Sequence, residues 1–162
     1  MVGFGYDIHQ LVPNRRLLLG GVEIEFPKGL LGHSDGDVLI HAICDALLGA
    51  ASLGDIGMHF PPSDKRYKNI SSLKILKSVS KFLEDSGFMI KHIDTVVIAQ
   101  EPRLSPHIKE MKATISNAIG ISEDTISIKS KTNEGLGDIG SGRAIAAWAI
   151  CEIGRIYATS EG

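Results

Sequence analysis

The sequence predicts an α+β fold in which a mixed β-sheet packs against α-helices, with its elements in the order ββααβαβα. Two observations support this prediction. The N-terminal part reads as two strands joined by turn residues, and the second half alternates β-branched segments with segments of helical period. The chain has 162 residues, of which 43% are hydrophobic and 22% are charged. This length and composition suit one compact domain, spanning residues 1–162.

The first half contains two predicted strands followed by two predicted helices, at 2–10, 16–26, 37–51 and 72–87. Pro13 and Asn14 separate the strands, which we expect to be antiparallel, and Gly20-Gly21 marks a bulge or a turn within the second. Apolar residues recur with helical period after Asp37, and Ser71 or Ser72 can cap the second helix. Between the helices, glycines and prolines predict an irregular loop over 53–62.

The second half contains a strand at 88–99, a helix at 105–120 and a strand at 126–130. After the glycine-dense segment 135–142, an Ala- and Ile-rich run containing Trp148 predicts a final helix that ends near Tyr157. Cys44 and Cys151 each fall in an apolar segment that we predict to be helical, so we expect buried free thiols rather than a disulfide or a metal site.

Charge and hydropathy exclude several classes of partner. Lys and Arg total 17 against 19 Asp and Glu, and no long run of like charge is present, so we expect no nucleic-acid partner. The longest apolar run, 144–151, is far below the roughly 20 residues that span a bilayer, so we expect no membrane partner. The N-terminus lacks the features of a signal or transit peptide. We therefore expect a cytoplasmic protein or the mature form of a plastid one.

Several polar residues suggest a metal site. Asp7 and His9 stand at i and i+2 on a strand and so share one face, while Asp37, His41 and Asp45 share one face of an apolar helix. If that helix packs on the strand, Asp7, His9 and His41 supply a carboxylate and two imidazoles, with a fourth position open. The alternative is a buried His41 that bonds to Asp37 or Asp45.

Two further segments suit phosphate groups. His33 to Asp37 precedes a helix N-terminus, where free amide groups favour an anion, although Ser34 or Asp37 can equally cap the helix. Lys129 to Glu134 ends a strand, so that Glu134 could hold Mg²⁺, or the segment could be only a capped turn. The letters G-x-G-x-x-G at 135–140 do not indicate a dinucleotide site, because no acid-bearing strand follows.

Four motifs together resemble those of the 2-C-methyl-D-erythritol 2,4-cyclodiphosphate synthase family, and the resemblance covers the whole chain. They are Tyr-Asp-Ile-His at 6–9, His-Ser-Asp-Gly-Asp-Val at 33–38, Gly-Asp-Ile-Gly at 54–57 and Lys-Thr-Asn-Glu at 131–134. The resemblance implies a single catalytic domain that converts 4-diphosphocytidyl-2-C-methyl-D-erythritol 2-phosphate into the 2,4-cyclodiphosphate and CMP, in non-mevalonate isoprenoid biosynthesis. It also implies a homotrimer, with sheets packed around the threefold axis and active sites between subunits.

The resemblance also assigns roles to residues. It implies that Asp7, His9 and His41 bind one Zn²⁺ per subunit, that Glu134 binds Mg²⁺ or Mn²⁺, and that His33 and Thr132 steady the transition state. Phosphate and methylerythritol contacts would come from Asp7, His9, His33, Ser34, Asp45, Asp55, Ile56, Gly57, Phe60, Pro61, Pro62, Ser63 and Asp64. The cytidine of a neighbouring subunit's substrate would contact Ala99, Gln100, Glu101, Pro102, Arg103, Leu104, Ser105, Lys131, Thr132 and Asn133, beside Glu134.

The glycine-rich end departs from the family pattern. Asp138, Ser141 and Arg143 stand where the family commonly has Phe, Arg and Glu, around a cavity near the trimer axis. We include Asp138 and Ser141 among the candidate ligand contacts, while the departure puts isoprenoid diphosphate binding there in doubt. Two alternatives to the synthase are a metal-dependent phosphohydrolase that uses zinc-bound hydroxide and a non-catalytic metal-binding trimer.

Overall fold

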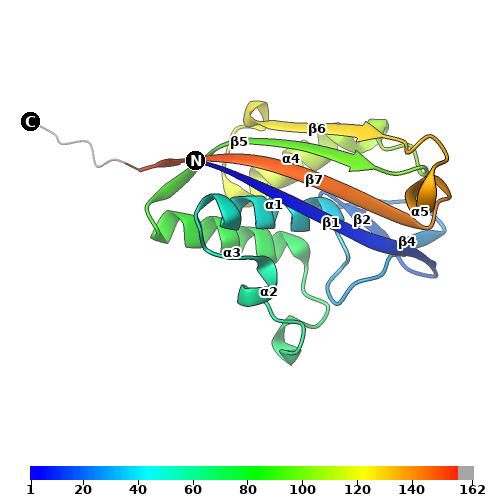
Figure 1. The fold of residues 1–162 in the computed structure, drawn as a ribbon, viewed down its shortest axis with the longest axis horizontal. Coiled ribbons are helices and arrows are strands. Elements are labelled where there is room, and N and C mark those ends of the chain that lie inside the picture. The colour runs from blue at the N-terminus through cyan, green and yellow to red at the C-terminus, as the bar shows by residue number, and fades with distance from the viewer. Residues whose placement is uncertain (157–162) are drawn as a thin grey trace, which may run out of the picture.

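The structure is a computed structural model that describes residues 1–156. A five-stranded sheet is covered on one face by the three longer helices, α1, α3 and α4 (Figure 1). The strands are β1 (Val2–Pro13), β2 (Leu17–Leu19), β3 (Val22–Ile24), β4 (Lys28–Leu30), β5 (Phe88–Ile98), β6 (Ile126–Lys131) and β7 (Ala144–Arg155). The helices are α1 (Val38–Ala50), α2 (Ile56–His59), α3 (Ser72–Asp85), α4 (Ile108–Ile119) and α5 (Gly137–Gly140), with 3₁₀ turns at Lys65–Tyr67, Ser105–His107 and Glu123–Thr125.

The main sheet is mixed and has the strand order β4-β1-β7-β5-β6. β1 pairs antiparallel with both β4 and β7, and β7 pairs antiparallel with β5. Among the strand pairs within residues 1–156, only β5 and β6 are parallel, and α4 lies on the crossover connection that such a pair requires. The predicted α+β class with a mixed sheet is therefore confirmed, as are α1, α3, β5, α4 and β6 within a few residues of their expected bounds.

The predicted final helix is wrong, because the segment forms the central strand β7 between β1 and β5. Ala144 to Ala147 are buried on both faces of the sheet, so the run carries no alternation that would identify a strand. A short apolar run cannot be assigned from periodicity alone, and its alanines favour a helix only until the two neighbouring strands supply hydrogen-bonding partners. The predicted end near Tyr157 lies outside the described residues.

Three smaller differences concern the first half. The predicted strand at 16–26 is a hairpin of β2 and β3 that forms its own two-stranded sheet, so the expected antiparallel pairing with the strand at 2–10 is wrong. Gly20 and Gly21 form the turn of this hairpin, with positive φ angles of 59° and 75°. The short strand β4 was expected to be loop, and the expected loop at 53–62 contains the helix α2. Element order therefore differs from ββααβαβα, although the layers are those predicted.

Helix α1 lies directly on strand β1, and two glycines make this close approach possible. A Cβ atom at Gly5 would lie 2.0 Å from the carbonyl oxygen of Ala42, and one at Gly3 would lie 2.0 Å from that of Ala46. Asp7 and His9 follow on the same face of β1, because side chains alternate along a strand. The glycines thus bring α1 close to the strand that carries these two polar residues.

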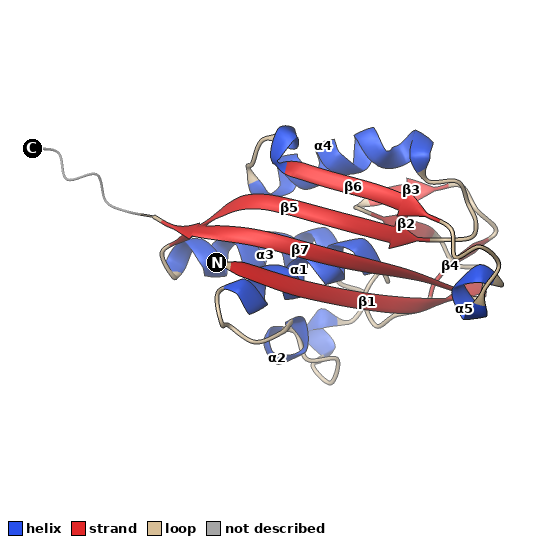
Figure 2. Cartoon of the chain, turned by 45° about the horizontal axis from the view of Figure 1, so that its top comes forward, coloured by secondary structure: helices blue, strands red, loops and turns tan. Residues whose placement is uncertain are grey.

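The opposite face of the sheet carries large exposed apolar side chains. Figure 2 shows the strands in front of α1 and α3. Phe4 is 63% exposed and Ile150 is 49% exposed, and Val2, Tyr6 and Ile8 are also exposed on β1. The Tyr6 and Trp148 rings lie beside one another with centroids 4.9 Å apart. None of the helices within residues 1–156 combines the length and apolar character needed to cross a bilayer.

Both cysteine thiols are free and fully buried, as expected, although Cys151 lies in strand β7 rather than in a helix. Burial raises the pKa of Cys151 to about 12 and raises the pKa of Cys44 well above its usual value. We therefore expect native protein at pH 8 to react with neither thiol when treated with an aromatic disulfide reagent, and both to react after unfolding in guanidinium chloride. Rapid colour development from the folded protein would contradict this burial.

Candidate metal and substrate site

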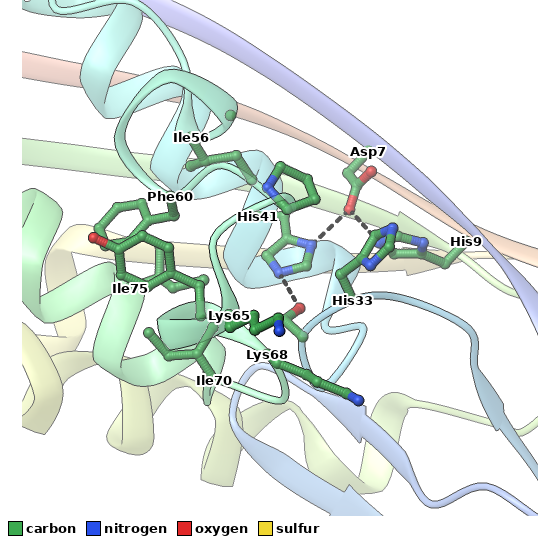
Figure 3. Close-up of a pocket in the computed structure, with 14 residues that line it drawn as sticks. Asp7, His9, His33, His41, Ile56, Phe60, Lys65, Lys68, Ile70 and Ile75 are labelled. Carbon is green, nitrogen blue, oxygen red and sulfur yellow. Dashed lines mark hydrogen bonds and ion pairs between the residues drawn. The ribbon is translucent and has the colours of Figure 1, made fainter.

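Three predicted metal ligands converge at the contact between β1 and α1. The Asp7 Oδ2 atom lies 3.1 Å from His9 Nε2 and 2.9 Å from His41 Nδ1 (Figure 3). One ligand atom from each residue can be chosen so that all three lie within 4.8 Å of one another. A carboxylate oxygen and two imidazole nitrogens are donors that zinc prefers, and three protein ligands leave a position for substrate. The donor set therefore fits a divalent metal, as the sequence predicted.

The charges in this cluster favour a ligand role for the carboxylate. Burial of Asp7 would raise its pKa, but hydrogen bonds from His41 and His9 outweigh it and hold the pKa well below its usual range. Burial of His41 would lower its pKa, but the hydrogen bond to Asp7 and the nearby carboxylates raise it instead. Asp7 is thus a stable anion that can face a cation.

Asp37, His41 and Asp45, which were predicted to share one helix face, bond to different partners. The Asp37 carboxylate caps α1 by accepting from the Ile40 N–H at 3.1 Å, and it also accepts from the Gly20 and Gly21 N–H groups at 3.0 and 2.7 Å. Burial raises the pKa of Asp37. The His41 ring contacts Asp7 rather than Asp37 or Asp45, so the alternative of a histidine bonded within the helix is not what the structure shows.

A cavity of about 320 Å³ opens beside the metal ligands. Its predicted members are Asp7, His9, His33, Ser34, His41, Ile56, Gly57, Phe60 and Pro62, and its further members are Lys65, Tyr67, Lys68, Ile70 and Ile75. The sequence interpretation missed this second group. The feature that could have indicated part of this group is the basic and aromatic run Lys-Arg-Tyr-Lys at 65–68, which directly follows the predicted substrate contacts at 60–64. The cavity therefore combines metal ligands, an apolar wall and two ammonium groups.

The segment before α1 is held in place by its neighbours. Arg15 Nη2 donates to the carbonyl oxygens of Ser34 and Gly32 at 2.8 and 3.2 Å, and the Asn69 N–H donates to the carbonyl oxygen of His33 at 3.0 Å. Because Asp37 provides the helix cap, the Ser34 hydroxyl is not needed for capping. Ser34 and His33 are both among the residues that line the cavity.

The other predicted contacts in the 45–64 region are placed around α2. The Asp45 carboxylate accepts from the Ile56 N–H at 2.9 Å, and burial raises the pKa of Asp45. Asp55 caps α2 by accepting from the Met58 N–H at 2.9 Å. Asp64 pairs with Arg66 at 2.6 Å, close to Pro61 and Ser63 in the chain. Asp45 and Asp55 thus orient the segment that contributes Ile56 and Gly57 to the cavity wall.

A second cavity, of about 460 Å³, contains most of the residues predicted to bind cytidine. It is lined by Ala99, Gln100, Glu101, Pro102, Arg103, Leu104, Ser130, Lys131 and Thr132. Ser105 accepts from Arg103 Nε at 3.0 Å, and Asn133 Nδ2 donates to the carbonyl oxygen of Leu136 at 2.8 Å. The structure therefore brings together two segments, after β5 and at the end of β6, that the sequence analysis grouped.

Glu134 stands beside this second cavity. The Thr132 hydroxyl donates to the Glu134 carboxylate at 2.8 Å, and Glu134 has a positive φ angle of 50°. Asp138 and Ser141 lie further along, in and just after α5, where Asp138 pairs with Arg143. Arg143 lies just before β7 rather than in a helix. Among the described residues, the linings of the two cavities share no member, and neither includes Asp138 or Ser141.

An α+β fold in which three potential metal ligands lie beside a cavity is typical of metal-dependent enzymes. Comparisons with known proteins identify the family. The YgbB family model matches residues 1–154, so the chain belongs to the YgbB family. A protein of Clostridium botulinum, named 2-C-methyl-D-erythritol 2,4-cyclodiphosphate synthase, is 56% identical over 152 residues, which are 94% of this chain and 97% of that protein.

Two solved structures are similar in fold. The bifunctional IspDF of Campylobacter jejuni matches with a TM-score of 0.92 and 40% identity over 95% of this chain, which spans only 42% of that longer chain. A CDP complex of IspF from Plasmodium falciparum matches with a TM-score of 0.85 and 36% identity, over 96% of each chain. The fold and the predicted family resemblance are thereby confirmed.

Proposed function

We propose that this chain is a phosphorus–oxygen lyase of the non-mevalonate isoprenoid pathway. It converts 4-diphosphocytidyl-2-C-methyl-D-erythritol 2-phosphate into 2-C-methyl-D-erythritol 2,4-cyclodiphosphate and CMP. The observation that carries the proposal is the convergence of Asp7, His9 and His41 beside a cavity that also presents Ser34 and two lysines. The names of relatives that match nearly the whole chain support the same activity.

The chain's polar residues would hold two cations. Asp7, His9 and His41 would hold Zn²⁺, and Glu134 would hold Mg²⁺ or Mn²⁺, which commonly takes one carboxylate together with phosphate oxygens. Bound there, the cations would neutralise phosphate charge and polarise the phosphorus–oxygen bonds. Lys65 and Lys68 add positive charge to the same cavity.

The residues position reacting groups rather than attack them. An oxygen of the substrate's 2-phosphate forms a bond to the β-phosphorus, while the bond from that phosphorus to the bridging oxygen breaks and CMP leaves with the electron pair. Since the second pKa of a phosphate monoester is about 6, the attacking oxygen is already deprotonated, and no dedicated general base is needed. His33, Ser34 and Thr132 would bind the phosphate oxygens and stabilise the charge that builds up on them.

The apolar side chains of the first cavity would also contribute to this reaction. Ile56, Phe60 and Ile70 line the cavity beside the metal ligands. They would pack against the methylerythritol carbon chain and exclude water, whose attack would release CMP without closing the ring. Asp45 and Asp55 contribute by orienting the α2 segment.

A homotrimer with active sites between subunits would unite the two cavities. Three strand spacings separate β6 from β1, which is about 14 Å, so one chain keeps its two sets of predicted contacts apart. A second copy could place its 99–105 and 131–134 segments beside the metal ligands of the first. The exposed Val2, Phe4, Tyr6, Ile8 and Ile150 supply an apolar sheet face for that assembly. Ligand binding at Asp138 and Ser141, and a cytoplasmic location, stay predictions.

Phosphorus NMR tests the activity directly. The purified protein with the named substrate, Zn²⁺ and Mg²⁺ is expected to yield cyclic diphosphate and CMP, and a sample treated with a strong chelator is expected to yield neither. Linear phosphates would instead indicate a metal-dependent phosphohydrolase. Unchanged substrate with a folded, metal-loaded trimer would indicate a non-catalytic binding protein. Either of these results would contradict the proposal.

A further inference from the structure

The edge of the His41 ring that points away from Asp7 contacts two serine hydroxyls through its Nε2 atom. His41 Nε2 lies 3.0 Å from Ser34 Oγ and 2.9 Å from Ser72 Oγ. Ser34 lines the cavity, whereas Ser72 is the first residue of α3 and is only 1% exposed. The metal-ligand cluster therefore continues into the protein through a buried hydroxyl that the sequence analysis considered only as a helix cap.

Ser72 is in turn held by a carboxylate from the segment before α1. Asp35 accepts from the Ser72 hydroxyl through Oδ1 and from the Ser72 N–H through Oδ2, the latter at 2.8 Å. An ionised carboxylate accepts hydrogen bonds but does not donate them, and a hydroxyl has a single proton. The Ser72 hydroxyl must therefore donate to Asp35, so its oxygen is left to accept the hydrogen of His41 Nε2.

We infer that Asp35 and Ser72 form a positioning pair that fixes the tautomer and orientation of His41. In this structure Nδ1 donates to Asp7. With a hydrogen held on Nε2 by Ser72, Nδ1 is the nitrogen whose lone pair would be available to a metal ion in place of that hydrogen bond. Hydrogen bonds to the far nitrogen of a metal-binding histidine orient the ring and raise its basicity. The inference rests on the metal site of the proposed function and adds two residues that are not among those lining the cavity.

The hydroxyl groups of Ser34 and Ser72 differ in their other hydrogen-bond partners. Ser34 Oγ accepts from the Gly36 N–H at 3.3 Å, so this hydroxyl is not directed by a carboxylate. Ser72 Oγ is directed by Asp35, which makes it an obligatory acceptor for His41. Ser34 can therefore turn its proton towards a phosphate oxygen in the cavity, while Ser72 serves the histidine.

Ser72→Ala separates this role from simple support of α3. The substitution removes the hydroxyl but keeps the N–H that donates to Asp35, so the first turn of the helix stays anchored. Ser80→Ala is the matched control, because Ser80 is a buried serine two turns further along the same helix. Ser72→Thr restores a hydroxyl and is expected to recover part of the lost function.

The measurement is the zinc affinity of the metal-free protein, obtained by competition with a chromophoric chelator. Ser72→Ala is expected to weaken zinc binding by about tenfold or more, since loss of such supporting hydrogen bonds typically costs this much. Ser80→Ala is expected to bind zinc as the wild type does. In proton NMR of the zinc-loaded wild type, the His41 Nε2–H resonance should be protected from exchange, and in Ser72→Ala it should broaden or disappear.

Wild-type zinc affinity in Ser72→Ala, or an equal loss in Ser80→Ala, would overturn the inference, as would a wild-type protein that does not bind zinc. Melting temperatures of the metal-free variants identify any loss of zinc affinity that comes from unfolding. If Ser72→Ala is unfolded, the zinc affinity of the Ser72→Thr protein tests the inference instead. Because the readout is metal binding, a protein that binds zinc as expected but fails to form the cyclic product would contradict the proposed function alone.

Discussion

Replacing His41 with alanine is expected to abolish tight zinc binding and to lower turnover of the proposed substrate by about 1000-fold or more. The change removes one of three ligand atoms and leaves Asp7 and His9, which cannot complete a three-residue site. The measurement pairs equilibrium dialysis of zinc with the phosphorus NMR assay. His9→Ala is expected to have an effect of the same order, since both histidines face the same Asp7 oxygen.

The control for this prediction is His92→Ala. His92 is exposed on β5, at the bulge opposite β7, so its loss should leave zinc binding and turnover unchanged. His9→Ala also protects the test against unfolding, because the His9 ring is 23% exposed while that of His41 is 7% exposed. A folded His9→Ala protein with wild-type turnover would exclude the Asp7 cluster as the catalytic metal site.

Gly5→Ala is expected to lower the free energy of unfolding by about 3 kcal/mol, near the upper end of the usual cost of overpacking. Its Cβ atom would lie 2.0 Å from the carbonyl oxygen of Ala42, within a helix that has no room to move without shifting its whole buried face. Urea denaturation measures the loss. Because His41 precedes Ala42 on that helix, zinc affinity should fall as well.

Gly49→Ala provides the matched comparison on the same helix. Gly49 is exposed, and a Cβ atom there would meet nothing within 4 Å. Alanine in place of glycine within a helix stabilises by about 1 kcal/mol, so this variant should be somewhat more stable than the wild type. Equal stabilities for Gly5→Ala and wild type would show that α1 does not lie as close to β1 as described.

The group of metal ligands could be predicted because each ligand is placed by a local sequence pattern. Asp7 and His9 share a face through strand alternation, and His41 lies on a helix whose period is clear, so only the packing of one on the other had to be assumed. The strand β7 could not be predicted, because a strand buried on both faces has no alternating pattern and its partners are distant in sequence.

Part of the cavity wall, and the pair of Ser72 and Asp35 beside His41, could likewise not be predicted from the sequence. Lys65 and Lys68, which follow α2, and Ile75, which lies in α3, line the same cavity as residues of β1 and α1 that are distant in the sequence. Ser72 and Asp35 are 37 positions apart, and no local pattern relates them. The sequence reveals which side chains can perform chemistry, while long-range packing decides which of them act together.

The central position of β7 also determines when the metal site can form. β1, which carries Asp7 and His9, comes first among the described elements, yet it pairs along most of its length with β7, which comes last among them. Pairing between distant segments closes a long loop and is slow. Until β7 is in place, no strand joins β1 to β5. A fixed arrangement of Asp7, His9 and His41 is therefore expected only once Ala144–Arg155 has joined the sheet.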